Sequence, residues 1–206
     1  MNIFNTHYDK YDRWFEKYPN IYEEEIITIK SLMPAFTTAM EIGVGSGRFA
    51  SALNIPFGIE PSYNMAKIAK KRGIKIARTK VEEINYKYKF DFVLAVTTIC
   101  FVANPSLMIQ NAYKSLKKGG FLTIAFIDKN SKLGRTYRKN KYKSLFYSNA
   151  KFFNEKEITY LMKKAGFTDL KCKENLYAKE LNNMTFGINE CKNGAFKVIR
   201  GKKPLF

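Results

Sequence analysis

A glycine-rich segment is the part of the sequence whose residue types and spacing point most directly to chemistry. It reads Glu41-Ile42-Gly43-Val44-Gly45-Ser46-Gly47-Arg48-Phe49, after a short apolar run and before a helix-like stretch. Glycines at a strand-to-helix junction allow a tight turn and let a ligand approach the main chain closely. The segment therefore predicts a site for a nucleotide-like ligand, although a bare GxG pattern also occurs in ordinary turns.

Two features separate this segment from the fingerprint of dinucleotide-binding proteins. The glycines are spaced GxGxG, and Arg48 stands at the sixth position, where the fingerprint has a small residue. An acid, Glu41, also precedes the first glycine by two residues. A carboxylate there repels a pyrophosphate but suits a ligand that carries an ammonium and a sulfonium group. The segment therefore favours S-adenosylmethionine.

A second acid, Glu60, follows the next predicted strand in Phe57-Gly58-Ile59-Glu60-Pro61-Ser62. The carboxyl edge of the strands is where open α/β sheets bind ligands, and a carboxylate there can accept both hydroxyls of a ribose. Glu60 is our strongest candidate for cofactor binding. The alternative is an acid that only complements the dipole of the helix that follows.

With these motifs in order, nearly the whole chain resembles class I methyltransferases, in particular the group called methyltransferase type 11. Met65 resembles the apolar residue that packs on adenine, and the segment with Val81 and Glu82 resembles the one that borders the adenine ring, with Lys80 where an Asp is common. Leu116-Lys117-Lys118-Gly119-Gly120 is similar to the family's LKPGG turn.

The resemblance also implies that the end of strand 90–96 faces the transferred methyl group and that an N-terminal helix folds over the cofactor. Tyr11 and Trp14 would then reach the site; from periodicity alone they fit a buried helix face equally well. S-adenosylhomocysteine is the expected product. The implied cofactor-binding set is Glu41, Gly43, Val44, Gly45, Gly47, Arg48, Phe49, Glu60, Pro61, Ser62, Met65, Val81, Glu82, Val96, Thr97, Tyr11 and Trp14.

Methyl transfer from a sulfonium is an in-line displacement, so the protein's main task is to align the reactants. A general base is needed only for an acceptor that arrives protonated. The catalytic residues stay unassigned, and the candidates by position are His7, Tyr8, Tyr11, Thr97 and Thr98.

Short apolar runs alternate with helix-like stretches after Pro34, which is typical of βαβ units. Strands are expected at 39–44, 57–59, 74–77, 90–96 and 121–126, and an antiparallel pair at 167–177 and 195–199. Helices are expected at 49–53, 63–72, 106–116 and, from Asn154, 154–165. We expect a Rossmann-like α/β fold whose seven-stranded, mostly parallel sheet has helices on both faces.

The chain is expected to form one methyltransferase domain over 1–206. Residues 1–33 would make an N-terminal helical cap, and the basic, aromatic stretch 128–151 would be an insertion or lid without clear periodicity. Nothing near the first residue reads as an export signal and no apolar run is long enough to cross a membrane, so we expect a cytoplasmic protein, as a monomer or homodimer.

The composition of the chain indicates which kinds of partner and metal site to expect. The net charge of +18 invites a nucleic-acid partner, but the lysines are spread along the chain. Cys100, Cys172 and Cys191 show neither a paired pattern nor metal spacing, so we expect reduced thiols, and with one histidine we expect no metal centre.

The sequence favours methyl transfer to a small-molecule acceptor. One alternative is an RNA methyltransferase that uses the basic stretch 139–143 with Tyr137, Tyr142 and Phe146 for phosphates and base stacking. Another is a cofactor-binding protein that no longer transfers a methyl group.

Overall fold

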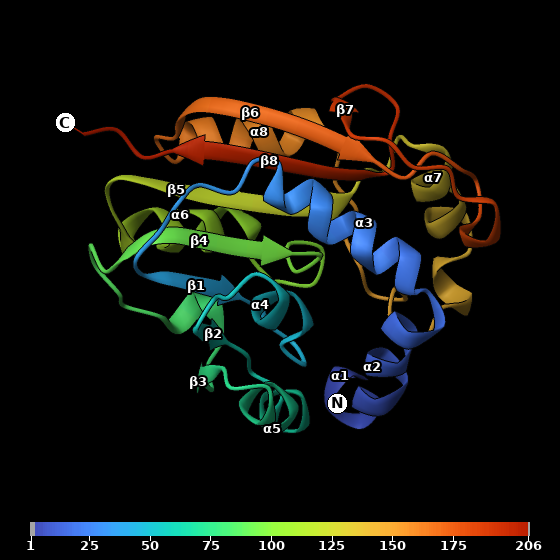
Figure 1. The fold of residues 1–206 in the computed structure, drawn as a ribbon, viewed down its shortest axis with the longest axis horizontal. Coiled ribbons are helices and arrows are strands. Elements are labelled where there is room, and N and C mark those ends of the chain that lie inside the picture. The colour runs from blue at the N-terminus through green and yellow to red at the C-terminus, as the bar shows by residue number, and fades with distance from the viewer. Residues whose placement is uncertain (1–2, 206) are drawn as a thin grey trace.

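A mixed sheet of eight strands runs through the centre of the molecule (Figure 1). The computed structural model describes residues 3–205. The strand order is β3-β2-β1-β4-β5-β8-β6-β7; β1 to β5 are parallel, whereas β8 pairs antiparallel with both β5 and β6. The strands are β1 (Ala39–Ile42), β2 (Phe57–Ile59), β3 (Lys75–Ala77), β4 (Phe90–Val96), β5 (Leu116–Ile127), β6 (Thr168–Asn175), β7 (Asn189–Glu190) and β8 (Phe196–Lys202).

Helices cover both faces of the sheet, so the predicted Rossmann-like class is confirmed. The α-helices are α1 (Ile3–Thr6), α2 (Tyr8–Lys17), α3 (Pro19–Lys30), α4 (Arg48–Ala52), α5 (Tyr63–Lys71), α6 (Pro105–Ser115), α7 (Lys132–Lys139) and α8 (Glu155–Lys164). Short 3-10 turns lie at η1 (Val81–Glu83), η2 (Lys141–Lys143) and η3 (Leu181–Asn183).

Two apolar cores lie on the opposite faces of the sheet because strand side chains alternate. In β4, Leu94 and Val96 join the core that includes Phe15 of α2 and Ile29 of α3. Val93 and Ala95 join the other core, beneath α6 and α8. The strand order reverses between β1 and β4, and the loops at that point are where open α/β sheets hold their ligands.

The first three helices lie along one face and one end of the sheet. α3 packs against β6 and β8, and α1 packs against α5 (Figure 1). The side chain of Asn5 in α1 accepts hydrogen bonds from Ser62 Oγ (3.1 Å) and from the backbone N–H of Asn64 (3.0 Å). The N-terminal segment is therefore hydrogen-bonded to the residues that follow β2.

The fold differs from the expected one in three places. It has eight strands rather than seven, because the two-residue β7 pairs with β6 at the edge. β5 begins at Leu116 and not at residue 121, so the segment that resembles the LKPGG turn lies within an irregular stretch of that strand. Segment 128–151, expected to lack periodicity, contains α7, whose N-cap Ser131 accepts a hydrogen bond from the Gly134 N–H.

The expectation of unpaired thiols is wrong for two of the three cysteines. Cys172 and Cys191 form a disulfide, with 5.6 Å between their Cα atoms. The register of β6 and β7 explains the pairing: Lys173 lies opposite Glu190, so Cys172 falls opposite Cys191. A separation of 19 residues gave no sign of this hairpin. Cys100 is a buried free thiol. Within residues 3–205, none of the helices has the length and apolar character to cross a membrane.

Candidate active site

The glycine-rich loop joins β1 to α4 in a backbone conformation that requires glycine. Gly43, Gly45 and Gly47 have φ angles of +65°, +55° and +84°. A Cβ on Gly43 would overlap the side chain of Thr98, which follows β4. The Val44 N–H donates to the Ile59 carbonyl (3.0 Å), so the loop is fastened to the neighbouring strand β2. The loop thus lies at the reversal point of the sheet.

Glu60, at the end of β2, is held directly against this loop. Its side chain accepts hydrogen bonds from the backbone N–H groups of Gly45 (3.0 Å) and Ser62 (2.7 Å). The residue is only 7% exposed, and burial raises its pKa above the ordinary value despite these hydrogen bonds. Each carboxylate oxygen can accept a further hydrogen bond, so Glu60 can serve hydroxyl donors of a ligand.

Glu41 lies within β1, beneath the same loop, and is 1% exposed. One of its carboxylate oxygens, Oε2, has no hydrogen-bond partner in the described chain. Burial raises its pKa well above the ordinary value, and the nearby Glu60 raises it further. A buried carboxyl oxygen without a donor is costly unless a ligand supplies one.

Tyr11 and Thr97 meet beside the loop. A Cβ built on Gly45 would lie 3.8 Å from the Tyr11 ring, and the Tyr11 hydroxyl lies close to the Thr97 side chain. Thr97 has φ +47°, a left-handed conformation that strains a β-branched residue and is often found at functional sites. Burial raises the pKa of Tyr11 far above neutrality, so its hydroxyl stays protonated.

A cluster of charges anchors α2 over the loop. Asp12 accepts hydrogen bonds from Ser46 Oγ (2.6 Å), from Arg48 Nε (2.9 Å) and from Arg72 Nη2 (2.8 Å). Burial opposes ionisation of Asp12, but the hydrogen bonds from Arg48 and Arg72 lower its pKa well below the ordinary value. Arg48, predicted to touch the cofactor, is therefore occupied by Asp12 and by Glu16 (2.8 Å).

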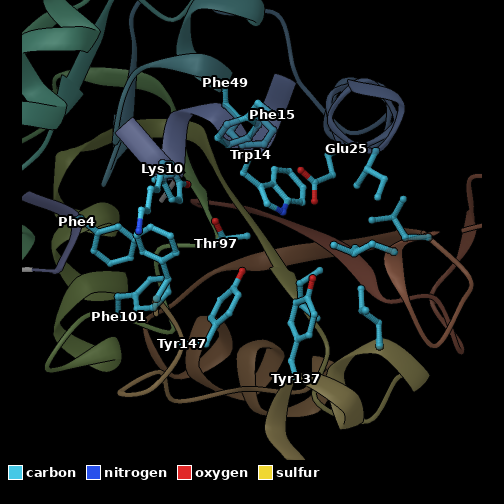
Figure 2. A pocket seen from close by; sticks show the side chains of 17 residues that line it. Phe4, Lys10, Trp14, Phe15, Glu25, Phe49, Thr97, Phe101, Tyr137 and Tyr147 are labelled. Atoms are coloured by element: carbon cyan, nitrogen blue, oxygen red, sulfur yellow. The ribbon is translucent and has the colours of Figure 1, made fainter. Parts of the chain in front are cut away.

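Next to Tyr11 and Thr97, a pocket of about 130 Å³ lies between the N-terminal helices, the end of the sheet and segment 128–151 (Figure 2). Most of the residues that line it are aromatic or aliphatic. They are Phe4, Lys10, Tyr11, Trp14, Phe15, Ile21, Glu25, Phe49, Thr97, Phe101, Ile127, Leu133, Tyr137, Phe146, Tyr147, Leu176 and Leu181.

The structure brings together some of the predicted residues and separates others. Tyr11, Trp14, Phe49 and Thr97 line the pocket. The Thr98 hydroxyl donates to the Val96 carbonyl (3.0 Å), so Thr98 shapes the turn. The remaining predicted residues do not line the pocket. They are the candidate bases His7 and Tyr8 on the N-terminal segment, the loop and strand-end residues Glu41, Gly43, Val44, Gly45, Gly47, Arg48, Glu60, Pro61, Ser62 and Val96, and the predicted adenine neighbours Met65, Val81 and Glu82.

Sequence reasoning missed Glu25, the acid in the pocket wall. A signal was present: Glu25 lies four residues after Ile21 and four before Ile29, and all three are buried on one side of α3. In contrast, Glu23 in the same helix is exposed. The run of three glutamates obscured the one that points inward.

Comparisons with known proteins place this geometry in a family. Residues 11–171 match the family model described as a methyltransferase domain. The chain is 41% identical over 185 residues to an uncharacterised protein of Methanocaldococcus jannaschii, which covers 89% of each chain. It is 29% identical to phosphoethanolamine N-methyltransferase 2 of Caenorhabditis elegans, over 81% of this chain and 42% of that protein.

A solved structure from Thermotoga maritima is similar over 98% of both chains, with a TM-score of 0.93 and 43% identity. It is described as an S-adenosylmethionine-dependent methyltransferase and a possible histamine N-methyltransferase. A phosphoethanolamine N-methyltransferase 2 of Haemonchus contortus, solved with S-adenosylhomocysteine, shares the fold at a TM-score of 0.64 and 17% identity, over 88% of this chain and 52% of that one.

Proposed function

Because the chain belongs to the class I S-adenosylmethionine-dependent methyltransferases, we propose that it methylates a small molecule that binds in the aromatic pocket beside Thr97. The pocket itself is the observation that carries this proposal. Its 130 Å³ is comparable to protein cavities of on the order of 150 Å³ that hold a molecule the size of benzene. It is adjacent to Tyr11, which lies against the glycine-rich loop.

The residues around that loop fit the cofactor. Glu60 would accept the ribose hydroxyls at the lone pairs that Gly45 and Ser62 leave free. The unpartnered Oε2 of Glu41 would accept a hydrogen bond from the ammonium group of the cofactor's methionine part. Burial raises the pKa values of both acids, and a ligand with hydroxyl and ammonium donors would stabilise their charged forms.

The cofactor supplies a methyl group already activated by a sulfonium. The chain's own work is to hold the acceptor in line and to exclude water. Tyr11 and Thr97 lie where the loop and the pocket meet, and their hydroxyls are suited to orient an acceptor. Because Tyr11 stays protonated, we assign it a role as hydrogen-bond donor and not as a base.

Several observations favour a small molecule over RNA. Tyr137 and Phe146, the candidates for stacking on RNA bases, line the pocket, and of that set Tyr142 alone is largely exposed, at 84%. Among the similar proteins, one is described as a possible histamine N-methyltransferase and another is named phosphoethanolamine N-methyltransferase 2. The N-terminal helices and segment 128–151 would act as cap and lid over the acceptor.

The proposal is tested by supplying S-adenosylmethionine with a labelled methyl group to the protein together with either a panel of small amines, thiols and phenols or purified RNA. We expect label in a small molecule. A Leu181→Trp variant, which places a bulky ring in the pocket, should lose at least tenfold in rate and keep its affinity for the cofactor. Leu205→Trp, at an exposed position, should keep the rate of the wild type. Label in RNA, or equal activity of Leu181→Trp, would overturn the proposal.

A further inference from the structure

Glu25 is a buried acid in the pocket wall. It is 5% exposed, and the described chain offers its carboxylate neither a hydrogen bond nor an ion pair. Polar residues near it in α3 are paired, since the Asn175 side chain donates to Glu24 (2.8 Å) and to Thr28 (3.1 Å). A carboxyl group in a largely apolar pocket, without a partner from the described chain, is a candidate for binding a ligand.

The carboxylate of Glu25 is directed from α3 toward Trp14 and the interior of the pocket (Figure 2). The hydroxyl ends of Tyr137 and Tyr147 point into the same space from segment 128–151. Among the residues that line the pocket, Glu25 is the one acidic residue and Lys10 the one basic residue. Lys10 is exposed on α2. The interior therefore combines a carboxyl group with aromatic rings.

We propose that the acceptor is a small organic amine that binds as a cation, with its ammonium group donating to Glu25 and its body packed among Trp14, Tyr137 and Tyr147. To accept a methyl group on that nitrogen, the ammonium would first pass one proton to the Glu25 carboxylate, which frees the nitrogen lone pair. This inference rests on the proposed function and specifies its substrate class. An ammonium compensates the buried carboxylate and is attracted to the negative faces of aromatic rings. An anionic acceptor would be repelled by Glu25, and a neutral one would leave it without a counter-charge.

The geometry also implies that amine binding is coupled to a proton. Burial raises the pKa of Glu25 to about 8, so below that pH the empty pocket holds the neutral acid. The groups that face it from α2 and segment 128–151 are the hydroxyls of Tyr11, Tyr137 and Tyr147, whose pKa values burial raises beyond the physiological range, and the exposed Lys10. An ammonium favours the charged carboxylate, so binding releases a proton and tightens as the pH rises toward 8.

Trp14 is the single tryptophan and lies in the pocket, so its fluorescence reports ligand binding without any methyl transfer. We would titrate the protein at pH 8 with 2-phenylethylamine and n-butylamine, with the alcohols of the same carbon skeletons, and with 3-phenylpropanoate. We expect each amine to bind at least tenfold more tightly than its alcohol and the carboxylate to bind most weakly. Glu25→Gln should remove this preference, and Glu23→Gln, at an exposed position of the same helix, should keep it.

Calorimetric titration with S-adenosylmethionine separates this inference from the proposed function. Unchanged cofactor affinity in Glu25→Gln shows that this variant is folded, so that a lost amine preference belongs to the pocket. Failure of the wild type to bind the cofactor would count against the proposed function, whatever the amines do. Alcohols that bind as tightly as amines, or a preference that survives in Glu25→Gln, would overturn the amine assignment.

Discussion

At the scale of single residues, the candidate site is marked by carboxyl groups that the fold buries without a cationic partner. Glu41, Glu60 and Glu25 lack cationic partners among the described residues, although the chain carries a net charge of +18. Asp12 differs from these acids, because it forms ion pairs with two arginines and has a structural role. An acid that the protein leaves unpaired is the one available to a cationic ligand.

Glu41 makes cofactor binding depend on pH. Its pKa in the empty site is raised well above the ordinary value by burial, and an ammonium ligand favours the ionised form. Protons are therefore released on binding, so the affinity for S-adenosylmethionine should increase with pH over the range in which the empty site is still protonated. Titration calorimetry at several pH values, in buffers of different ionisation enthalpy, measures both effects. Glu41→Gln should weaken cofactor binding and reduce the change of affinity with pH to the smaller contribution of Glu60. An unchanged dependence of affinity on pH would show that Glu41 does not bind the cofactor.

At the scale of elements, α2 is held over the glycine-rich loop by the charges around Asp12. Removing this carboxylate leaves Arg48 and Arg72 partly buried without their partner, so Asp12→Ala should lower the free energy of unfolding by roughly 2–4 kcal/mol. Asp9→Ala breaks the exposed pair with Arg13 in the same helix and should cost under about 1 kcal/mol. Urea unfolding of both variants checks this difference, and equal losses would show that the cluster does not anchor the helix.

The order of strands and helices could be predicted because apolar periodicity and capping residues are local signals. The helix expected from Asn154 is α8, with the capping box between Asn154 and Glu157 in place. Glu60 and the glycine-rich loop could be singled out because strand ends converge at one edge of a parallel sheet. The disulfide of Cys172 and Cys191 depends on a hairpin register that no local pattern records.

The lining of the pocket could not be predicted either, because it also depends on contacts between distant segments. Tyr137 and Phe146 read as surface residues of a basic stretch, and only the packing of segment 128–151 against the N-terminal helices turns them inward. Glu25 was missed because three successive glutamates look like a solvated helix face, whereas α3 lies against β6 and β8. Contacts between segments more than 100 residues apart decide the acceptor side of the site, and the sequence pattern does not contain them.

At the scale of the whole molecule, the cofactor residues and the acceptor pocket lie together where the strand order reverses. The parallel half of the sheet contributes the glycine-rich loop and Glu60, and residues of the N-terminal helices and of segment 128–151 line the pocket beside them (Figure 2). The net charge of +18 is spread along the chain. The groups to which we assign ligand binding are buried acids, Glu41, Glu60 and Glu25.

Calorimetric titration of the protein with S-adenosylmethionine, alongside Glu60→Ala, shows whether the cofactor binds at the glycine-rich loop and Glu60. We expect one site per chain in the wild type. We also expect about tenfold to a hundredfold weaker binding in Glu60→Ala, because hydrogen bonds to a charged carboxylate are lost. Glu180→Ala, at an exposed position, should bind like the wild type. No binding in the wild type, or equal affinity of Glu60→Ala, would rule out this cofactor site.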